Sequence, residues 1–206
     1  MQFHSFPDVG DRQIVGDMSS DILSRPLDAS RFSLLYAGAQ KNLGPSGVTV
    51  VLLRESWLAG ANKHVPTMFR YATYVKNNSL YNTPPSFGVY VLNLVLQWVE
   101  SNGGLPGMAE RNGRKAGLLY DAIDQSGGYY RGHAAADSRS LMNVTFRLPD
   151  ETREKAFLAE ATAASMVGLA GHRSVGGLRA SIYNAVPVEA CQALASLMGD
   201  FAKRHA

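Results

Sequence analysis

Two apolar, strand-like runs enclose a short loop near the start of this 206-residue chain, and the loop carries a lysine among glycines. The runs are FSLLYAGA at 32–39 and GVTVVLLRE at 47–55, and the lysine between them is Lys41. Apolar, β-branched residues without polar alternation are typical of a fully buried strand, which we expect for 47–55. Loops at the ends of strands are rigidly supported places for binding groups. The sequence therefore predicts a sheet with Lys41 in a loop at a strand end.

The rest of the chain divides into two sections that meet near residue 101. Before that point, RQIVGDMSS indicates a short strand, and the apolar run that follows Pro84 and Pro85 predicts a long buried helix stopped by glycines. A further helix, ended by Gly127 and Gly128, begins the second section. Strand, helix, strand and helix follow it, and they include a strand over 140–150 and a last helix opened by Pro187. We therefore expect an α/β chain with a sheet and helices in 1–101 and a smaller α+β layer in 102–206.

Composition and charge exclude several classes of protein. The content of hydrophobic residues, 46%, and of charged residues, 18%, is that of a folded globular chain. A net charge of +3 without a long basic run argues against nucleic acid as a partner. The longest apolar stretch, 87–99, is too short to span a membrane, and the N-terminus lacks a signal peptide, so we expect a cytoplasmic protein. We predict no metal site, and the one cysteine, Cys191, should pack in the core.

Lys41 allows three interpretations. It could be an ordinary solvated lysine. It could bind phosphate, but the G-x-x-x-x-G-K-[ST] spacing of a phosphate loop is missing. It could be a lysine that forms a Schiff base with a carbonyl group, which requires some desolvation of the amine. With pyridoxal phosphate as the carbonyl, an acidic residue must pair with the ring nitrogen, and Asp17 at the end of the preceding strand meets this requirement. The alternative for Asp17 is a turn closed with Ser19 and Ser20.

Four stretches in order resemble the phosphoserine aminotransferases, fold-type I enzymes that use pyridoxal phosphate. They are GDMSSDILSRPLD, YAGAQKNLGPSGVTVV, YNTPPSFGVY and GHRSVGGLRASIYNA, and the resemblance runs over essentially the whole chain. It implies that 1–101 is the C-terminal part of the large cofactor-binding domain, with a mostly parallel sheet and helices, and that 102–206 is the small α+β domain. It also implies transamination between glutamate and 3-phosphohydroxypyruvate to give phosphoserine for serine biosynthesis. Some members of the family also process a phosphorylated hydroxythreonine for pyridoxine biosynthesis, and the sequence leaves this open.

The resemblance also implies a role for each matching residue. Lys41 would hold the cofactor as a Schiff base, Asp17 would bind the ring nitrogen, and Gln40 would contact the cofactor phosphate. Asn82 and Thr83 would reach the phosphate of the cofactor in the other subunit of a homodimer. Substrate phosphate and carboxylate would be recognised by three residues of the last matching stretch: His172, Arg173 and Arg179.

Each of these assignments has a plainer alternative. Asn82 and Thr83 precede the prolines at a helix N-terminus, which suits a phosphate, but they could simply cap that helix. Arg179 falls in a strand pattern where a charge is out of place unless paired, either with a substrate carboxylate or in a structural ion pair. His172 and Arg173 lie in a glycine-flanked loop and could be an exposed basic pair.

The sequence departs from the family at its N-terminus, because the family's chain is much longer there. The glycine-containing loop for the cofactor phosphate, the aromatic residue on the pyridine ring, and the arginine and histidine residues for glutamate have no counterpart here. We therefore expect a truncated portion with little activity alone. The alternatives are an inactive module that dimerises through the helices around 84–100, and another fold-type I aminotransferase. The position of Cys191 on an apolar helix face argues against a cysteine desulfurase of this fold.

Overall fold

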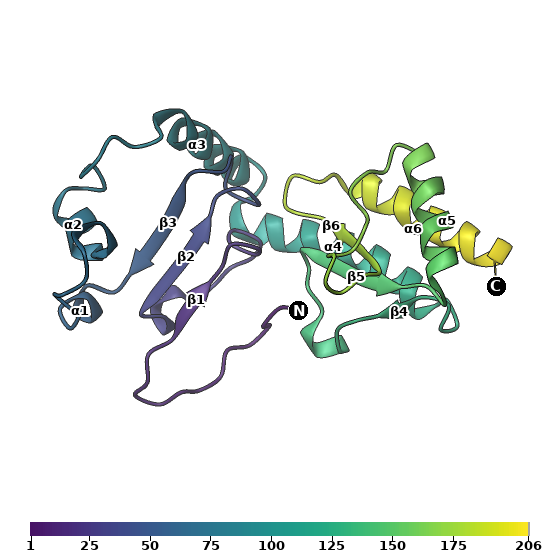
Figure 1. Cartoon of the computed structure of the whole chain (residues 1–206), viewed down its shortest axis with the longest axis horizontal. Helices are drawn as coiled ribbons and strands as arrows, with labels where there is room; N and C mark the ends of the chain where they lie inside the picture. Colours follow the sequence, from purple (N-terminus) through teal and green to yellow (C-terminus); the bar gives the residue numbers. More distant parts are fainter. Residues whose placement is uncertain (206) are drawn as a thin grey trace. The chain divides into compact units, whose positions relative to one another are not determined.

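The computed structural model describes residues 1–205, and the chain divides into two compact units (Figure 1). The first unit is Pro7–Leu105, and the second combines Met1–Phe6 with the chain from Pro106 onward. From the sequence we expected the first six residues in the first section and the boundary near 101. Gln2 explains the difference at the N-terminus, since its backbone N–H donates to the Ser138 carbonyl at 3.0 Å and its side-chain oxygen accepts from the Leu141 N–H at 2.9 Å.

The first unit is built on a three-stranded sheet in the order β1-β2-β3. Its strands are β1 (Val15–Asp17), β2 (Leu34–Gly38) and β3 (Thr49–Leu53). β1 runs parallel to β2, so the carboxyl ends of both strands lie at one edge of the sheet, whereas β3 runs antiparallel to β2. Helices complete the unit: α1 (Glu55–Leu58), α2 (Tyr71–Lys76), α3 (Ser86–Ser101) and two short 3-10 helices, Ala29–Arg31 and Thr67–Phe69.

The predicted burial of β3 and α3 is wrong for the structure. No residue of β3 is buried, and α3 buries only Gly88 and Val99, while Phe87 is 75% exposed. An apolar sequence pattern indicates a surface to be covered, but it does not say that residues of the same chain cover it. Even so, no helix within residues 1–205 has the length and hydropathy needed to cross a membrane.

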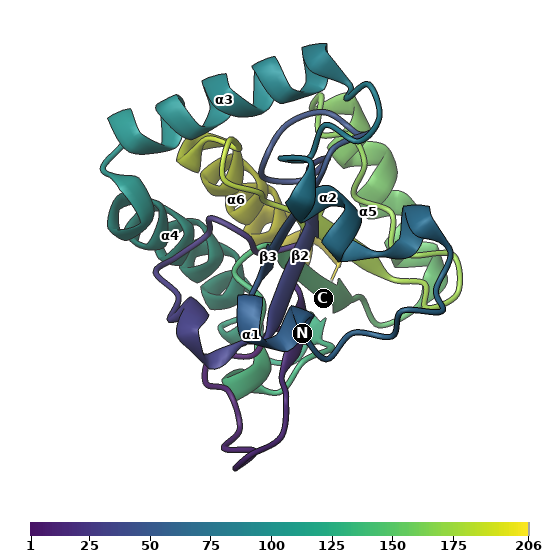
Figure 2. The same ribbon diagram turned by 90° about the vertical axis from the view of Figure 1, so that its left-hand side faces the viewer.

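The second unit packs three helices (Figure 2) with an antiparallel sheet in the order β4-β5-β6 (Figure 1). Its elements are α4 (Gly104–Asp124), β4 (Arg131–Gly132), a 3-10 helix (Ala136–Ser138), β5 (Asn143–Arg147), α5 (Glu151–Ala163), β6 (Leu178–Ser181) and α6 (Val188–His205). Alternate residues of β5 and β6 form the core face, where Val144 pairs with Ala180 and Phe146 with Leu178. The other residues of these strands, including Arg179, belong to a polar face.

The core of the second unit is rich in aromatic rings. Phe157 of α5 is fully buried and contacts the rings of Phe146, Tyr130 and Phe201, with centroid distances of 6.2, 6.2 and 5.2 Å. Each pair has the edge-to-face geometry that rings prefer. Cys191 of α6 joins this core as predicted, and burial raises the pKa of its thiol.

Two polar side chains of α4 enter the same core. Lys115 is fully buried, and its ammonium donates to the carbonyls of Ile182 at 2.8 Å and Tyr183 at 2.7 Å. The amide of Asn112 donates to the side-chain oxygen of Asn184 at 2.8 Å. Burial lowers the pKa of Lys115 to about 8, because the charged amine has left water. These contacts fix the segment that follows β6 to α4.

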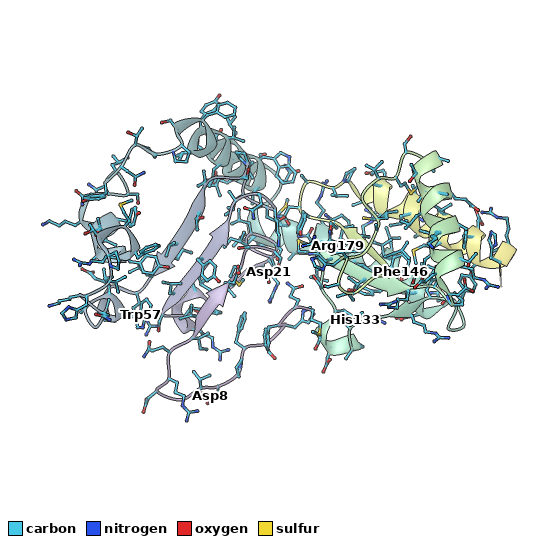
Figure 3. All side chains as sticks on the ribbon, viewed as in Figure 1. Asp8, Asp21, Trp57, His133, Phe146 and Arg179 are labelled. Carbon is cyan, nitrogen blue, oxygen red and sulfur yellow. The ribbon has the colours of Figure 1, made fainter. Side chains whose placement is uncertain are left out.

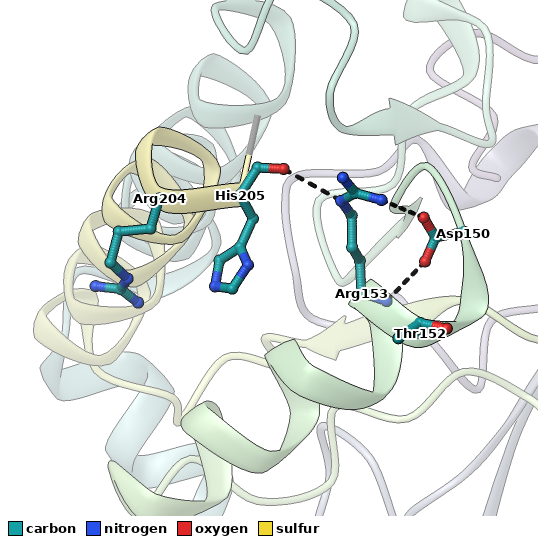
Figure 4. Close-up of a pocket in the computed structure, with 5 residues that line it drawn as sticks. All are labelled: Asp150, Thr152, Arg153, Arg204 and His205. Carbon is teal, nitrogen blue, oxygen red and sulfur yellow. Dashed lines mark hydrogen bonds and ion pairs between the residues drawn. The ribbon is translucent and has the colours of Figure 1, made fainter.

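The end of α6 is tied to the start of α5 (Figure 4). The carboxylate of Asp150 caps α5 by accepting from the Arg153 N–H at 2.8 Å, and the Arg153 guanidinium donates to the His205 carbonyl at 3.1 Å. The His205 ring stacks on Phe201 with centroids 4.1 Å apart. Four of the residues that line the pocket here make contacts within or between α5 and α6, and they are Asp150, Arg153, Arg204 and His205.

Candidate functional site

The carboxyl edge of the first sheet brings Asp17 and Lys41 to one place. Asp17 is the last residue of β1, and Lys41 lies in the turn that begins directly after β2. The carbonyl of Ala39 closes this turn by accepting from Leu43 at 3.0 Å and from Gly44 at 2.8 Å. Because β1 and β2 are parallel, both residues lie at the same edge, and the side chains of both are exposed.

The turn that carries Lys41 is held from two sides. Asn42 is buried, and its amide donates to the Ile22 carbonyl, in the segment after β1, at 3.0 Å. Gly44 has a φ of +147°, and a side chain there would begin 3.6 Å from the backbone of Leu92 in α3. Glycine thus permits the backbone conformation, and the turn packs against α3 at an ordinary van der Waals distance. Lys41 is therefore presented by a turn fixed to two neighbouring segments.

The carboxylate of Asp17 is held in its ionised form. The Ser19 hydroxyl and the Ser19 N–H, at 2.9 Å, donate to it, the Tyr36 hydroxyl donates as well, and the charge of Lys41 acts in the same direction. Together these groups lower the pKa of Asp17 below its usual value. The turn with Ser19, considered as an alternative role for Asp17, is present, and the charge of Lys41 acts on the same carboxylate. The result is a carboxylate and an amine within electrostatic reach of each other.

Gln40 folds its side chain over the strand before the turn. Its amide oxygen lies 2.7 Å from the point where a Cβ at Gly38 would stand. Gly38 is two residues after Tyr36, so both belong to the same face of β2, and Asp17 is the neighbour of Tyr36 in β1. The missing side chain at Gly38 thus makes room for the Gln40 amide on the face that carries Asp17.

Asn82 and Thr83 lie exposed in the loop before α3. The N-cap of α3 is Pro85, and no side chain within residues 1–205 caps that helix end. The Asn82 amide instead donates to the Thr83 carbonyl at 3.1 Å. The alternative that these two residues cap the helix is therefore wrong, and their side chains remain accessible at its N-terminal end.

Arg179 extends from the polar face of the second sheet, opposite Thr145 (Figure 3). A charge in this strand is not out of place, because alternate residues of β6 face away from the core. Among the described residues Arg179 has no ion-pair partner, and its half-buried side chain leaves Nε buried without a hydrogen-bond partner. The structural ion pair considered from the sequence is therefore absent from the described chain. The guanidinium of Arg179 remains available to bind an anionic ligand.

His172 and Arg173 lie in an exposed loop closed by a hydrogen bond of 2.8 Å between the Gly171 N–H and the Gly177 carbonyl. The His172 ring contacts the Ser174 hydroxyl at 2.7 Å. The guanidinium of Arg147, in β5, donates to the Val175 carbonyl and so fixes the loop to the sheet. The loop is thus shaped by the backbone and by Arg147, and it presents both basic side chains to solvent.

The predicted residues fall into two groups. Asp17, Gln40, Lys41, Asn82 and Thr83 belong to the first unit, and His172, Arg173 and Arg179 belong to the second. The role of Tyr36 was not found from the sequence, because only the register of β1 against β2 places this residue beside Asp17. Lys115 was missed as well, although a lysine within the apolar pattern of α4 could have signalled a buried polar contact.

Known proteins match this chain in both sequence and structure. The family model Aminotransferase class-V matches residues 9–194. A phosphoserine aminotransferase of Herpetosiphon aurantiacus is 67% identical over 204 residues, which are 99% of this chain and 57% of that protein. The solved phosphoserine aminotransferase from Bacillus circulans subsp. alkalophilus superimposes with a TM-score of 0.96 at 62% identity, over 100% of this chain and 57% of that one. The phosphoserine aminotransferase from Trichomonas vaginalis, solved with bound PLP, gives a TM-score of 0.89 at 39% identity, over 95% of this chain and 56% of that one.

Proposed function

Because this chain belongs to the class-V aminotransferase family, we propose that it carries the lysine, the ring-nitrogen partner and the substrate-binding residues of a phosphoserine aminotransferase. The reaction is the transfer of an amino group between glutamate and 3-phosphohydroxypyruvate, which gives phosphoserine for serine biosynthesis. The observation that carries the proposal is the pair of Asp17 and Lys41 at one sheet edge, with an ionised carboxylate in reach of the lysine charge. The 67% identity to a curated phosphoserine aminotransferase supports the choice of substrate.

The residues at this edge fit pyridoxal phosphate. An ionised carboxylate suits a protonated ring nitrogen, an exposed amine suits the aldehyde, and the Gln40 amide beside Gly38 is a donor for the phosphate. When bound, the cofactor supplies a carbonyl carbon for the amino group and a ring that takes up the electron pair released at the substrate α-carbon. Asp17 keeps the ring nitrogen protonated, and this makes the ring a better electron acceptor.

Lys41 serves as both the tether and the proton carrier. Its Nζ would hold the cofactor through the aldehyde group. Once released, the Lys41 amine would act as the base that takes up the proton from the substrate α-carbon and as the acid that gives it back. Backbone hydrogen bonds to Ala39 close the turn that carries Lys41, and this gives the Lys41 side chain a fixed origin at the sheet edge.

The substrate is recognised by the basic residues of the second unit. Arg179, with its unpaired Nε, binds the α-carboxylate through its planar fork. His172 and Arg173 bind the phosphate in a loop where glycines let the backbone approach an anion. The same site accepts a phosphorylated hydroxythreonine, because that molecule carries the same two anionic groups.

Asn82 and Thr83 are proposed to act in a homodimer, where they reach the cofactor phosphate of the partner subunit. Exposed apolar side chains flank them on both sides, and these include Tyr81, Phe87 and Tyr90, with exposed fractions of 48, 75 and 58%. Covering such a surface with a second copy gives the hydrophobic gain that an obligate interface needs.

The choice of substrate is tested by loading the chain with pyridoxal phosphate and titrating it in a calorimeter with phosphoserine and with serine. We expect tighter binding of phosphoserine, and an Arg173→Ala variant that loses most of the difference. Arg131→Ala, at an exposed arginine of β4, is the matched control and should leave the difference intact. Equal affinities for the two ligands in the unmodified chain would contradict the assignment and favour another aminotransferase of this fold.

A further inference from the structure

The register of the first sheet places Tyr36 beside Asp17. The two residues are direct neighbours across the parallel strands β1 and β2, so their side chains leave the sheet on the same face. The Tyr36 hydroxyl donates a hydrogen bond to the Asp17 carboxylate. The tyrosine stays protonated at neutral pH, because the negative charge of Asp17 raises the pKa of Tyr36 further. Tyr36 can therefore act as a permanent donor to this carboxylate.

Ser19 holds the same carboxylate from the other side. Its N–H donates to one Asp17 oxygen at 2.9 Å, and its hydroxyl donates to the carboxylate as well. The hydroxyl oxygen of Ser19 in turn accepts from the Gly38 N–H at 3.0 Å. Gly38 is the last residue of β2, three residues before Lys41. Ser19 thus links the carboxylate of β1 to the backbone that leads into the Lys41 turn.

From these contacts we infer that Tyr36 and Ser19 are positioning residues, which aim the Asp17 carboxylate so that it can accept one further N–H donor, the ring nitrogen of the cofactor. The inference rests on the proposed function and deepens it. A carboxylate offers about four acceptor positions. The Ser19 N–H takes one of them at 2.9 Å, and the hydroxyls of Ser19 and Tyr36 also interact with the carboxylate. The space that is left suits a heteroaromatic ring with a single N–H. It does not suit the two parallel donors of a guanidinium group.

The charges around Asp17 agree with this arrangement. Lys41 faces Asp17 from the turn after β2, and its charge lowers the pKa of Asp17. Tyr71 lies in α2, in the helical segment that follows β3, and its charge raises the pKa of Tyr36. Lys41 contributes through its charge, and it contributes less than the donors of Ser19 and Tyr36. When the amine of Lys41 is engaged with a carbonyl group, the two donor residues therefore still keep Asp17 ionised.

The first arm of the test needs no cofactor. The pKa of Asp17 is measured in the 206-residue chain by carbon-13 NMR of its carboxyl group during a pH titration. We expect the Asp17 pKa to rise in Tyr36→Phe and in Ser19→Ala, to rise most in the double variant, and to return to the original value in Ser19→Thr, which keeps the hydroxyl. Tyr90→Phe, at an exposed tyrosine of α3, is the control and should leave the Asp17 pKa unchanged. An unchanged pKa in both Tyr36→Phe and Ser19→Ala would overturn the inference.

The second arm measures the affinity for pyridoxal phosphate from the absorbance of lysine-bound cofactor. We expect a roughly tenfold weaker affinity in Tyr36→Phe, the effect of one lost hydrogen bond to a charged group. An affinity equal to that of the unmodified chain would overturn the positioning role. If the Asp17 pKa moves as expected but the unmodified chain takes up no cofactor, the donor set around Asp17 is supported and the proposed function is the part that fails.

Discussion

The buried Lys115 makes the stability of the second unit depend on pH in a way that a single substitution can isolate. In the folded chain its pKa falls from the ordinary 10.5 to about 8, because the amine is fully buried. In the unfolded chain the amine returns to water and to its ordinary pKa. Between these two values the unfolded state therefore binds more protons than the folded state, and stability rises with pH. At 1.36 kcal/mol for each pH unit, the full rise between pH 8 and pH 10.5 is on the order of 3 kcal/mol.

The perturbation is Lys115→Met, which keeps most of the side-chain volume and removes the titrating group. Cys191 is close enough for its charge to interact with that of Lys115, so both chains should carry Cys191→Ala. The free energy of unfolding is measured in urea at a series of pH values by far-UV circular dichroism. Both tryptophans, Trp57 and Trp98, lie in the first unit, so a transition without a change in tryptophan fluorescence belongs to the second.

The expected result is a difference between the two chains that is flat below about pH 7. From pH 8 to pH 10.5 it should grow in favour of the chain that keeps Lys115 by about 3 kcal/mol. Lys155→Met, at an exposed lysine of α5, is the matched control and should reproduce the original profile. A difference between the two chains that stays flat up to pH 10.5, or that falls, would refute the claim that a charged amine is buried between α4 and the end of β6.

Single contacts give three further predictions. Gly38→Ala should displace the flexible Gln40 amide, whose oxygen lies 2.7 Å from the new Cβ. We expect weaker binding of pyridoxal phosphate with little change in thermal stability. An unaltered affinity for pyridoxal phosphate would contradict the role of Gln40. Phe157→Ala should lower the free energy of unfolding in urea by about 3–5 kcal/mol, because its ring is fully buried. The control Phe69→Ala, at a ring 76% exposed, should lower it by less than about 1 kcal/mol. Similar losses of stability in the two variants would refute the assigned core. Arg147→Met removes the donor to the Val175 carbonyl, so amide hydrogen exchange at Val175 and Gly176 should accelerate while that of Val144 stays slow, and unchanged exchange in the loop would show that Arg147 does not fix it.

The placement of Asp17 and Lys41 at one sheet edge could be predicted from the sequence, because it depends on the order of local elements. Strand ends are readable from apolar runs, and they placed Asp17 and Lys41 where the parallel pair β1 and β2 now brings them together. The apolar face of the last helix was also readable, and Cys191 lies buried in the core as expected. Such features depend on spacing along the chain, which a sequence shows directly.

Other features depend on which segments meet in space, and these escaped the sequence. The partner of Asp17 in the next strand is Tyr36 only because of the sheet register, which a shift of one residue would change. The apolar residues of α3 predicted burial, yet Phe87 and Tyr90 are exposed. Arg179 was expected to need a partner in its strand, whereas strand alternation alone gives it a place on the polar face.

The central claim is that Lys41 is the amine that binds the cofactor beside an ionised Asp17. The most direct measurement is reduction of the chain with borohydride in the presence of pyridoxal phosphate, followed by peptide mapping. The account predicts a covalent adduct on the peptide that contains Lys41, absent in Lys41→Ala and retained in Lys63→Ala, a variant at an exposed lysine of the same unit. An adduct spread over the exposed lysines without preference for Lys41, or no adduct at all, would contradict it.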